Sequence, residues 1–486
     1  MLHINVALPS GRSENLSVLQ SSKVGDLRVL AQKSFEQGFL KLVTSEGHVL
    51  NDPTESLQTA GLQDGDHITA ISLQARLAAT ASAFALWCCG CDKIVTWGSA
   101  YHGGDSSRVQ EKLKGVQQVQ TTWNAFAAIL SDGSVVTWGD PQCGGDNSAV
   151  EHQLKGVQQV RATAYAFSAI LADGSVVAWG DRADGGDCSA VQHQLQNVQR
   201  LQATNSAFAA ILADGSVVTW GDPQAGGVNA AVQDRLRCVK EVQATDSAFA
   251  AILADGSVVT WGNRGDGGDS STIQDQLVNV QQIQSTRSAF AAIRADGCVV
   301  AWGHPLWGGC CSAVQDQLIN VKQVQATRYA FAAILSDGSV VPWGDTQYGG
   351  DNSAVQHQLR SVQQVQASDS AFAAILADGS IVTWGDPDRG GDSSAVQDRL
   401  RCVKEVQATD CAFAAILADG SVVAWGNGDY GGNSSAVQDQ LTRNVQQLQA
   451  TEGAFAAILS DGSLVAWGVG RFGGDISGVN EDLASL

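Results

Sequence analysis

Cysteines are the first side chains to consider for chemistry, because thiolates bind metals and form disulfides. The chain has 11 cysteines, and only Cys88, Cys89 and Cys91 form a cluster. A zinc site needs a second Cys or His pair at finger spacing, and no such pair accompanies this C-C-x-C run. We therefore predict no metal site there and interpret the cluster as a reactive thiol patch or a turn. Scattered cysteines in a long chain without a secretory pattern predict reduced thiols and an intracellular, cytoplasmic or nuclear protein.

Histidines and aspartates each form part of a known functional pattern, a catalytic site and a calcium loop, but neither pattern is complete. Three histidines occupy one equivalent position of a repeated segment, where most copies carry Asp: His152, His193 and His357. No Ser/His or Cys/His arrangement accompanies them, which argues against nucleophilic catalysis. Three aspartates loosely resemble a calcium loop, without its glycine and distal Glu: Asp386, Asp388 and Asp392. The sequence predicts a protein that is not an enzyme and has no cofactor.

Charge and hydropathy exclude two classes of partner. The 49 Asp+Glu against 29 Lys+Arg give a formal net charge of −20. Nucleic-acid binding needs a basic surface that displaces counterions. No apolar run reaches the roughly 18 residues of a membrane span, and the first residues lack the pattern of a signal peptide. We predict neither nucleic acid nor membrane as a partner.

A repeat sets the architecture of most of the chain. Trp-Gly recurs ten times, at a spacing of 41 residues that the last step lengthens to 42. Each copy reads approximately VQQVQAT-xx-AFAAIL-ADG-SVVTWG-xxxx-GGDSSAVQDQL, and the copies run from about residue 75 to the end. A fixed period of this length indicates repeated supersecondary units that must stack to bury a core.

Each unit predicts three antiparallel strands. AFAAIL and SVVTWG are short, apolar and β-rich, and the Asp-Gly between them is a strong hairpin signal. VQQVQAT is a third, more exposed strand. SSAVQDQL, which begins with the capping box Ser148–Glu151 in one copy, predicts one or two helical turns. We expect an all-β domain over residues 75–486, a β-propeller of three-stranded blades, with an open β-solenoid of ten units as the alternative.

The units resemble repeats of the regulator of chromosome condensation, and more closely those of β-lactamase inhibitor protein II. The resemblance rests on a small-apolar strand, Asp-Gly, a strand ending in Trp-Gly, and a Gly-rich tail. It implies a seven-bladed propeller, and ten units depart from that number. The chain also has Ala125-Phe126 where the family often has His. A guanine-nucleotide exchange factor for a small GTPase is the activity that the resemblance implies.

Residues 1–74 form a different domain. MLHINVAL-PSGR-SENLSVL predicts a hairpin, KVGDLRVLAQKSF a helix, and FLKLVTSEGHVL and DGDHITAISL two more strands. This order resembles the α+β β-grasp of ubiquitin-like domains. The segment continues into the repeats without a Gly-Gly terminus, so we expect an integral domain and not a conjugated one.

The ubiquitin-like resemblance implies a recognition patch at Leu8, Val43 and Ala70. Alanine at the third position offers less area to bury and so a weaker contact. Two interpretations stay open for this domain. It docks on ubiquitin receptors or proteasome components, or it only caps the repeat array.

Variation between units points to a binding surface. Two windows change freely, the two residues before Ala-Phe and the four after Trp-Gly, and antiparallel strands place both on one rim, opposite the Asp-Gly turns. Eight aromatic residues, among them all five tyrosines, fall in these windows: Tyr101, Trp123, Tyr165, Trp307, Tyr329, Tyr348, Tyr430 and Phe472. Aromatics on variable loops over a rigid scaffold are typical of binding surfaces, although drift in unconstrained loops is an alternative. The repeated tryptophans are expected in the core.

These features together predict a monomeric, intracellular interaction scaffold. The rim captures a partner protein, and the ubiquitin-like domain docks on ubiquitin-pathway machinery. The alternatives are an exchange factor for a small GTPase and a purely structural repeat array.

Overall fold

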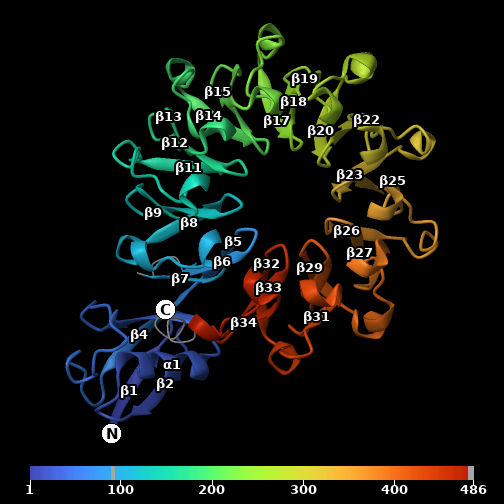
Figure 1. Cartoon of the computed structure of the whole chain (residues 1–486). Helices are drawn as coiled ribbons and strands as arrows, with labels where there is room; N and C mark the ends of the chain where they lie inside the picture. Colours follow the sequence, from blue (N-terminus) through green and yellow to red (C-terminus); the bar gives the residue numbers. More distant parts are fainter. Residues whose placement is uncertain (89–92, 480–486) are drawn as a thin grey trace.

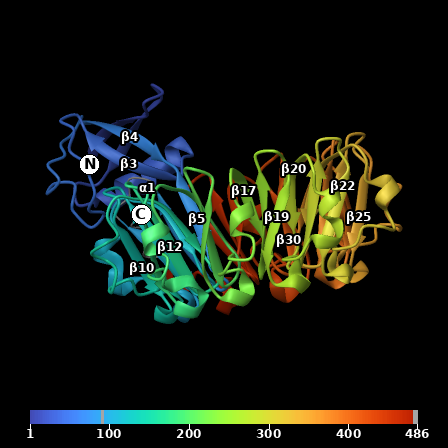
Figure 2. The ribbon, with the colours of Figure 1, turned by 90° about the horizontal axis from the view of Figure 1, so that it is seen from above.

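Ten three-stranded sheets stand side by side around a central axis in the computed structural model, which describes residues 1–88 and 93–479 (Figure 1). Figure 2 shows the sheets as a single layer, with the first residues of the chain at one edge of it. We call each sheet, with the loop that follows it, a unit, and number the units 1 to 10 in chain order.

The strands of each unit follow each other in sequence and are hydrogen-bonded in that order. The first strands are β5 (Ala75–Ala79), β8 (Val116–Thr121), β11 (Val157–Ala162), β14 (Val198–Ala203), β17 (Val239–Ala244), β20 (Val280–Ser285), β23 (Val321–Ala326), β26 (Val362–Ala367), β29 (Val403–Ala408) and β32 (Val445–Ala450). The second strands are β6 (Ala83–Cys88), β9 (Ala125–Leu130), β12 (Ala166–Leu171), β15 (Ala207–Leu212), β18 (Ala248–Leu253), β21 (Ala289–Arg294), β24 (Ala330–Leu335), β27 (Ala371–Leu376), β30 (Ala412–Leu417) and β33 (Ala454–Leu459). The third strands are β7 (Ile94–Gly98), β10 (Val135–Gly139), β13 (Val176–Gly180), β16 (Val217–Gly221), β19 (Val258–Gly262), β22 (Val299–Gly303), β25 (Val340–Gly344), β28 (Ile381–Gly385), β31 (Val422–Gly426) and β34 (Leu464–Gly468).

The Asp-Gly turns form as the sequence predicts. In unit 2, the Gly133 N–H donates to the Leu130 carbonyl at 2.9 Å, and Gly133 has a φ of +79°, which glycine adopts at little cost. The Asp132 carboxylate accepts the Ser134 N–H at 2.9 Å. The segment after Gly-Gly forms a short 3₁₀ helix in most units, such as η9 (Ser271–Gln276). In units 2 and 7 it forms only turns, so the predicted capping box Ser148–Glu151 begins no helix.

The core lies between neighbouring sheets. Each second strand buries a phenylalanine completely, and its ring stacks on the Trp of the third strand with centroids 5.0–5.3 Å apart in all ten units. The indole Nε1–H of each Trp donates to the carbonyl of a glycine in the preceding unit, at 2.9–3.1 Å. The repeated tryptophans are therefore core residues that also bond each sheet to its neighbour.

The ring is closed, so the structure does not have the open-solenoid arrangement. Trp97 of unit 1 donates to the Gly473 carbonyl of unit 10 at 3.0 Å, the same bond that joins every other pair of units. The Glu452 N–H of unit 10 likewise donates to the Ala81 carbonyl of unit 1 at 3.2 Å. Ten sheets thus form the radial arrangement of a β-propeller, in place of the seven that the family resemblance implies.

Residues 1–73 form a mixed four-stranded sheet with one helix packed on it. The elements are β1 (Leu2–Ala7), β2 (Ser13–Val18), α1 (Val24–Phe35), β3 (Phe39–Thr44) and β4 (His67–Leu73). The strand order is β2-β1-β4-β3, with β1 and β4 parallel. Val24, Leu27 and Ala31 of α1 are buried in the core of this sheet, while Val29 and Leu30 on the other side of the helix are partly exposed.

The prediction that Ala70 belongs to an exposed patch is wrong. Ala70 pairs with Leu42 in the register of β3 and β4, and both side chains are fully buried in the cluster that α1 covers. Because side chains alternate along a strand, the residue on the other face is Ile71, which is 39% exposed. Leu8 and Val43 are half-buried.

The N-terminal sheet packs across the junction of units 10 and 1. Phe39 of β3 is buried in one cluster with Phe84 of unit 1 and Ile458 of unit 10. A Cβ added at Gly38 would lie 3.2 Å from Gly462 of the last Asp-Gly turn. The domain therefore lies on the Asp-Gly side of the ring and spans the one junction that chain connectivity does not join.

Replacing Phe39 with alanine is expected to loosen this junction, because it removes an aromatic ring from the apolar cluster that joins the two ends. We expect hydrogen exchange of the Glu452 amide to accelerate about tenfold or more, through local opening. The control is Leu27→Ala, which creates a cavity in the N-terminal core away from the ring. Equal exchange at Glu452 in both variants would contradict the role of Phe39.

No helix in the described part of the chain is both long and apolar enough to cross a membrane.

Candidate binding rim and channel mouth

A repeated threonine brings the two variable windows together on one rim. In unit 6, the Thr286 hydroxyl donates to the carbonyl of Trp307, in the second window, at 3.0 Å. In unit 7, Thr327 Oγ1 accepts the Ala330 N–H at 3.0 Å and donates to the Tyr348 carbonyl at 2.8 Å. The expectation that both windows share a rim is met, and this hydrogen bond holds their backbones in place.

The eight predicted rim aromatics do not form one continuous surface. The structure divides them into four groups around the ring: Tyr101 alone, Trp123 with Tyr165, Trp307 with Tyr329 and Tyr348, and Tyr430 with Phe472. Tyr101 and Trp123 are the most exposed, at 63% and 43%, and the other six are half-buried.

The largest group spans units 6 and 7. The ring of Trp307 lies 4.7 Å from that of Tyr329, which meets Tyr348 edge-on at 4.7 Å. His304 also stacks on Trp307, with the two ring centroids 3.7 Å apart, and this contact was not predicted from the sequence. Beside Trp307, Leu306 is 72% exposed. We call these five residues the aromatic cluster.

Two of the other groups also join neighbouring units. Trp123 of unit 2 meets Tyr165 of unit 3 edge-on at 5.4 Å. Tyr430 of unit 9 lies 6.3 Å from Phe472 of unit 10, whose ring also faces the Arg471 guanidinium at 4.8 Å. Stacking of this kind orders the side chains before any partner arrives, which lowers the entropic cost of binding.

A closed belt of main-chain hydrogen bonds surrounds the central axis next to this rim. The residue that follows each repeated Thr or Ser donates its N–H to the carbonyl of the equivalent residue in the next unit, at 2.9–3.3 Å through all ten units. We call these the belt residues: Ala81, Trp123, Ala164, Asn205, Asp246, Arg287, Arg328, Asp369, Asp410 and Glu452.

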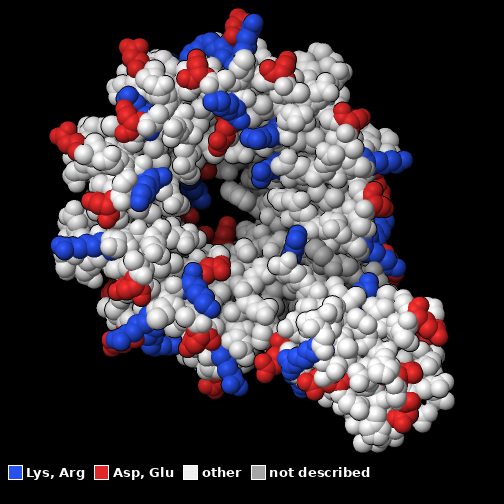
Figure 3. Space-filling view, turned by 180° about the vertical axis from the view of Figure 1, so that it is seen from behind, with Lys and Arg blue, Asp and Glu red and all other residues white. Residues whose placement is uncertain are grey.

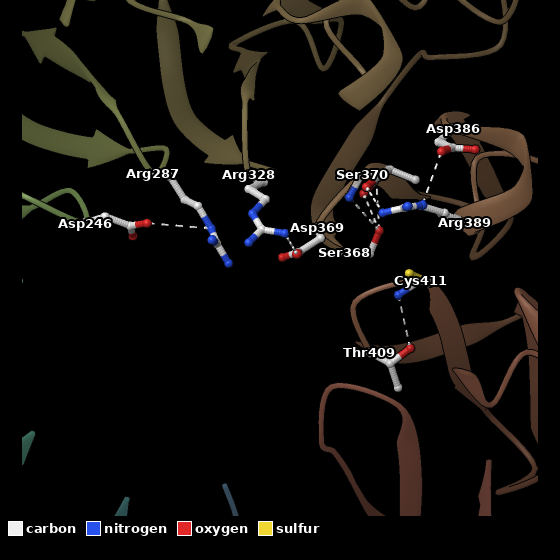
Figure 4. Close-up of polar contacts among 11 residues, drawn as sticks. Asp246, Arg287, Arg328, Ser368, Asp369, Ser370, Asp386, Arg389, Thr409 and Cys411 are labelled. Carbon is white, nitrogen blue, oxygen red and sulfur yellow. Dashed lines mark hydrogen bonds and ion pairs between the residues drawn. The ribbon is translucent and has the colours of Figure 1, made fainter. Parts of the chain in front are cut away.

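The belt residues line a cavity of about 740 Å³ at one end of the central channel. We call this cavity the channel mouth. Figure 3 shows the ring open at its centre, with charged side chains around the opening. Arg287 extends toward the open centre and lies 3.8 Å from Asp246, while Arg328 pairs with Asp369 at 3.0 Å (Figure 4). Arg328 also lies over the Tyr329 ring at 5.9 Å, which makes the channel mouth continuous with the aromatic cluster.

Carboxylates of units 9 and 10 are held in an unfavourable environment. Burial, with repulsion from Asp369 and Glu452, raises the pKa of Asp410 to about 7. Burial and the Asp369 charge also raise the pKa of Glu452. Such shifts show that these ionised groups lack full compensation by nearby positive charge.

The charged half of the belt was missed by the sequence analysis. The signal was present, because residues at one position of a 41-residue period are neighbours in a closed ring. That position is charged in units 5 to 10 and uncharged in units 1 to 4.

The other candidate residues serve local roles. His152, His193 and His357 are exposed on the outer segments. The Asp386 carboxylate accepts the Asp388 N–H at 3.0 Å and lies 3.4 Å from Arg389 (Figure 4), and Asp392 accepts the Ser394 N–H. Among the described residues, no group of three or more His, Cys, Asp or Glu side chains is arranged to hold a metal ion.

The cysteines agree only in part with the prediction of reduced thiols. Eight in the described part of the chain are free, but Cys88 is disulfide-bonded. Cys89 and Cys91 of the predicted cluster lie outside the described residues.

Comparison with known proteins gives only distant structural likenesses. No protein-family model matches the sequence, and no curated protein matches it. Prp20p from Saccharomyces cerevisiae is similar with 14% identity and a TM-score of 0.33, over 64% of this chain and 82% of that one. The computationally designed Ika8 protein has 14% identity and a TM-score of 0.32, over 73% and 96%. Human WBSCR16 has 15% identity and a TM-score of 0.30, over 71% and 88%.

Proposed function

We propose that this chain is a non-catalytic interaction scaffold whose rim captures a partner protein. The aromatic cluster is the observation that carries the proposal. It presents stacked, half-buried rings and an exposed leucine on loops whose backbones are fixed by the repeated threonines. Aromatic side chains that are ordered in advance and only partly covered are the usual anchors of protein interfaces.

The position of the N-terminal sheet also supports this proposal. That sheet packs on the Asp-Gly side of the ring, so the aromatic cluster on the opposite rim is left accessible. A partner at the rim and a second partner at the N-terminal domain can therefore bind without competing for the same surface.

We further propose that the N-terminal domain docks on ubiquitin-pathway machinery, as its sequence resemblance implies. The structure alters the residues involved, because Ala70 is buried. Leu8, Val43 and Ile71 take the place of the predicted patch, and Ile71 supplies the apolar area that alanine does not.

The test compares two triple variants of the full chain by proximity labelling in cells. Replacing Trp123, Trp307 and Tyr348 with alanine is expected to abolish labelling of the rim partner, because each lost aromatic anchor weakens an interface by about 1–4 kcal/mol. Thermal stability should stay nearly unchanged, since Trp123 and Trp307 lie outside the clusters between sheets and Tyr348 only packs, half-buried, against one of them. Loss of folding in this variant would contradict the assignment of these residues to a binding surface.

A second variant, Leu8→Ala with Val43→Ala and Ile71→Ala, should remove a different set of labelled proteins. The matched control is Val278→Ala with Ile319→Ala, which removes exposed apolar side chains from the outer segments. If the rim variant and this control lose the same proteins, the rim is not the capture surface.

A further inference from the structure

Charge is distributed unevenly around the channel mouth. Its wall carries four carboxylates and two guanidinium groups, all of them from units 5 to 10. The belt residues of units 1 to 4 are uncharged. Any group that enters the channel mouth therefore meets a charged half and a neutral half.

Both arginines are already matched with carboxylates. Arg287 pairs with Asp246 of unit 5, and Arg328 pairs with Asp369 of unit 8. Each ion pair joins neighbouring belt residues, so the positive charge of units 6 and 7 is compensated within the wall. An incoming anion would have to displace one of these carboxylates.

The remaining carboxylates have no such partner. Within the described residues, neither Asp410 nor Glu452 has a side-chain hydrogen bond or an ion pair. They are adjacent in the belt, where the Asp410 N–H donates to the Glu452 carbonyl at 3.0 Å. Two neighbouring carboxylates without an ion-pair partner on the wall of a cavity attract a positive charge.

An exposed indole follows these carboxylates around the belt. The sequence of belt residues is Asp410, Glu452, Ala81 and Trp123, each hydrogen-bonded to the next. Ala81 is the one belt residue between Glu452 and Trp123, and all three line the same cavity. Trp123 meets Tyr165 edge-on, which orders its ring. An exposed indole in the same cavity as these carboxylates favours an organic cation, because the ring face attracts positive charge and the ring covers an aliphatic chain.

We propose that the channel mouth binds a lysine or arginine side chain from a loop of the partner protein, with its cationic group at Asp410 and Glu452 and its aliphatic chain against Trp123. This inference rests on the proposed capture of a partner at the rim and adds the chemistry that the partner must present. The aromatic cluster, continuous with the channel mouth through Arg328, anchors the surface around that loop.

Protonation gives the site a predictable pH dependence. The charged groups that act on Asp410 are Asp369, Glu452, Arg328 and Arg287. Because its pKa is raised to about 7, Asp410 is neutral below that pH and negative above it. A bound cation stabilises the ionised form, so binding is tighter above pH 7 than below it.

The test measures binding of a fluorescent peptide, Ala-Gly-Lys-Gly-Lys-Gly-Ala, to the full chain by anisotropy. We expect saturable binding that weakens with added salt and with falling pH. Asp410→Asn with Glu452→Gln should weaken binding about tenfold or more, and Trp123→Ala by about threefold to tenfold. These variants keep the main-chain belt, and their circular dichroism should match that of the parent chain.

The matched control is Asp234→Asn with Asp275→Asn, which removes the same charge from exposed outer segments and should leave binding unchanged. Peptides with norleucine or glutamate in place of lysine should not bind. The proposal would be overturned if the lysine peptide showed no saturable binding, or if the norleucine peptide bound equally well. It would also be overturned if the glutamate peptide bound more tightly, or if Asp410→Asn with Glu452→Gln left the affinity unchanged.

The two proposals fail in different ways. If the lysine peptide fails to bind while the rim variant still loses its labelled partner, the channel mouth is wrong and the rim stands. If the rim variant keeps all its labelled proteins, the rim proposal fails whatever the peptide shows.

Discussion

Replacing Trp302 with alanine is expected to lower the free energy of unfolding by about 3–5 kcal/mol, the range for deleting a buried aromatic side chain. Trp302 is 4% exposed, stacks on Phe290 at 5.2 Å and donates to the Gly267 carbonyl of the preceding unit at 3.0 Å. The variant therefore loses packing within unit 6 and a bond to unit 5. Urea unfolding followed by circular dichroism measures the effect.

Two related variants separate the contribution of the indole hydrogen bond from that of packing, and a core tryptophan from a rim tryptophan. Trp302→Phe keeps most of the apolar volume and leaves the Gly267 carbonyl unpaired, so we expect a loss of about 1–3 kcal/mol. Trp307→Ala, five residues later on the rim, should cost less than about 1 kcal/mol, because its side chain is half-buried among loop residues. If Trp302→Ala and Trp307→Ala unfolded at the same urea concentration, the division between core and rim tryptophans would be wrong.

Replacing Gly308 with alanine is expected to destabilise the protein by about 2–5 kcal/mol, although it adds only one methyl group. Gly308 has a φ of +99°, which costs a residue with a Cβ about 1–2 kcal/mol. That Cβ would also lie 2.6 Å from Cδ2 of Phe331, in the next unit. The overlap forces the stacked ring away from its position, at a further cost of about 1–3 kcal/mol.

Gly428→Ala is the matched control for this prediction. Gly428 begins η15 (Gly428–Tyr430), and the nearest atom to its added Cβ is Cβ of Asn433, at 3.7 Å. We expect its free energy of unfolding to stay within about 0.5 kcal/mol of that of the parent chain, as for ordinary surface substitutions. Equal thermal shifts for the two alanine variants would show that contact between units does not depend on the glycine.

Local signals were sufficient to predict the elements of each unit. Asp132-Gly133 specifies its hairpin by turn geometry alone, and the apolar run of β9 specifies a strand buried on both faces. The tryptophans were assigned to the core because they recur at every unit, as an interface residue must. Each of these inferences depends on residues close together in the sequence.

Closure and the patch on the N-terminal sheet needed information that the sequence does not carry locally. Whether ten units close depends on the small angle between neighbouring sheets, which no single residue determines. The error at Ala70 arose from alternation, because in the run Ile68-Thr69-Ala70-Ile71 apolar residues occupy both faces of β4. Only the pairing of Ala70 with Leu42 shows which face is buried.

The candidate site was predictable in part. The variable windows were located correctly on one rim, since antiparallel strands leave no other arrangement. The grouping of aromatics depends on which loops are neighbours across units, as for His304 beside Trp307. Their role in binding stays a prediction.

The main-chain belt has a consequence for how this ring can diversify. Its hydrogen bonds use only N–H and carbonyl groups, so any residue with a main-chain N–H, which leaves out only proline, can occupy a belt position. Units that carry Ala81, Trp123 or Arg328 close with the same bond. The scaffold thus offers ten interchangeable positions around one opening, and a single substitution can give the ring a new ligand preference while its architecture is retained.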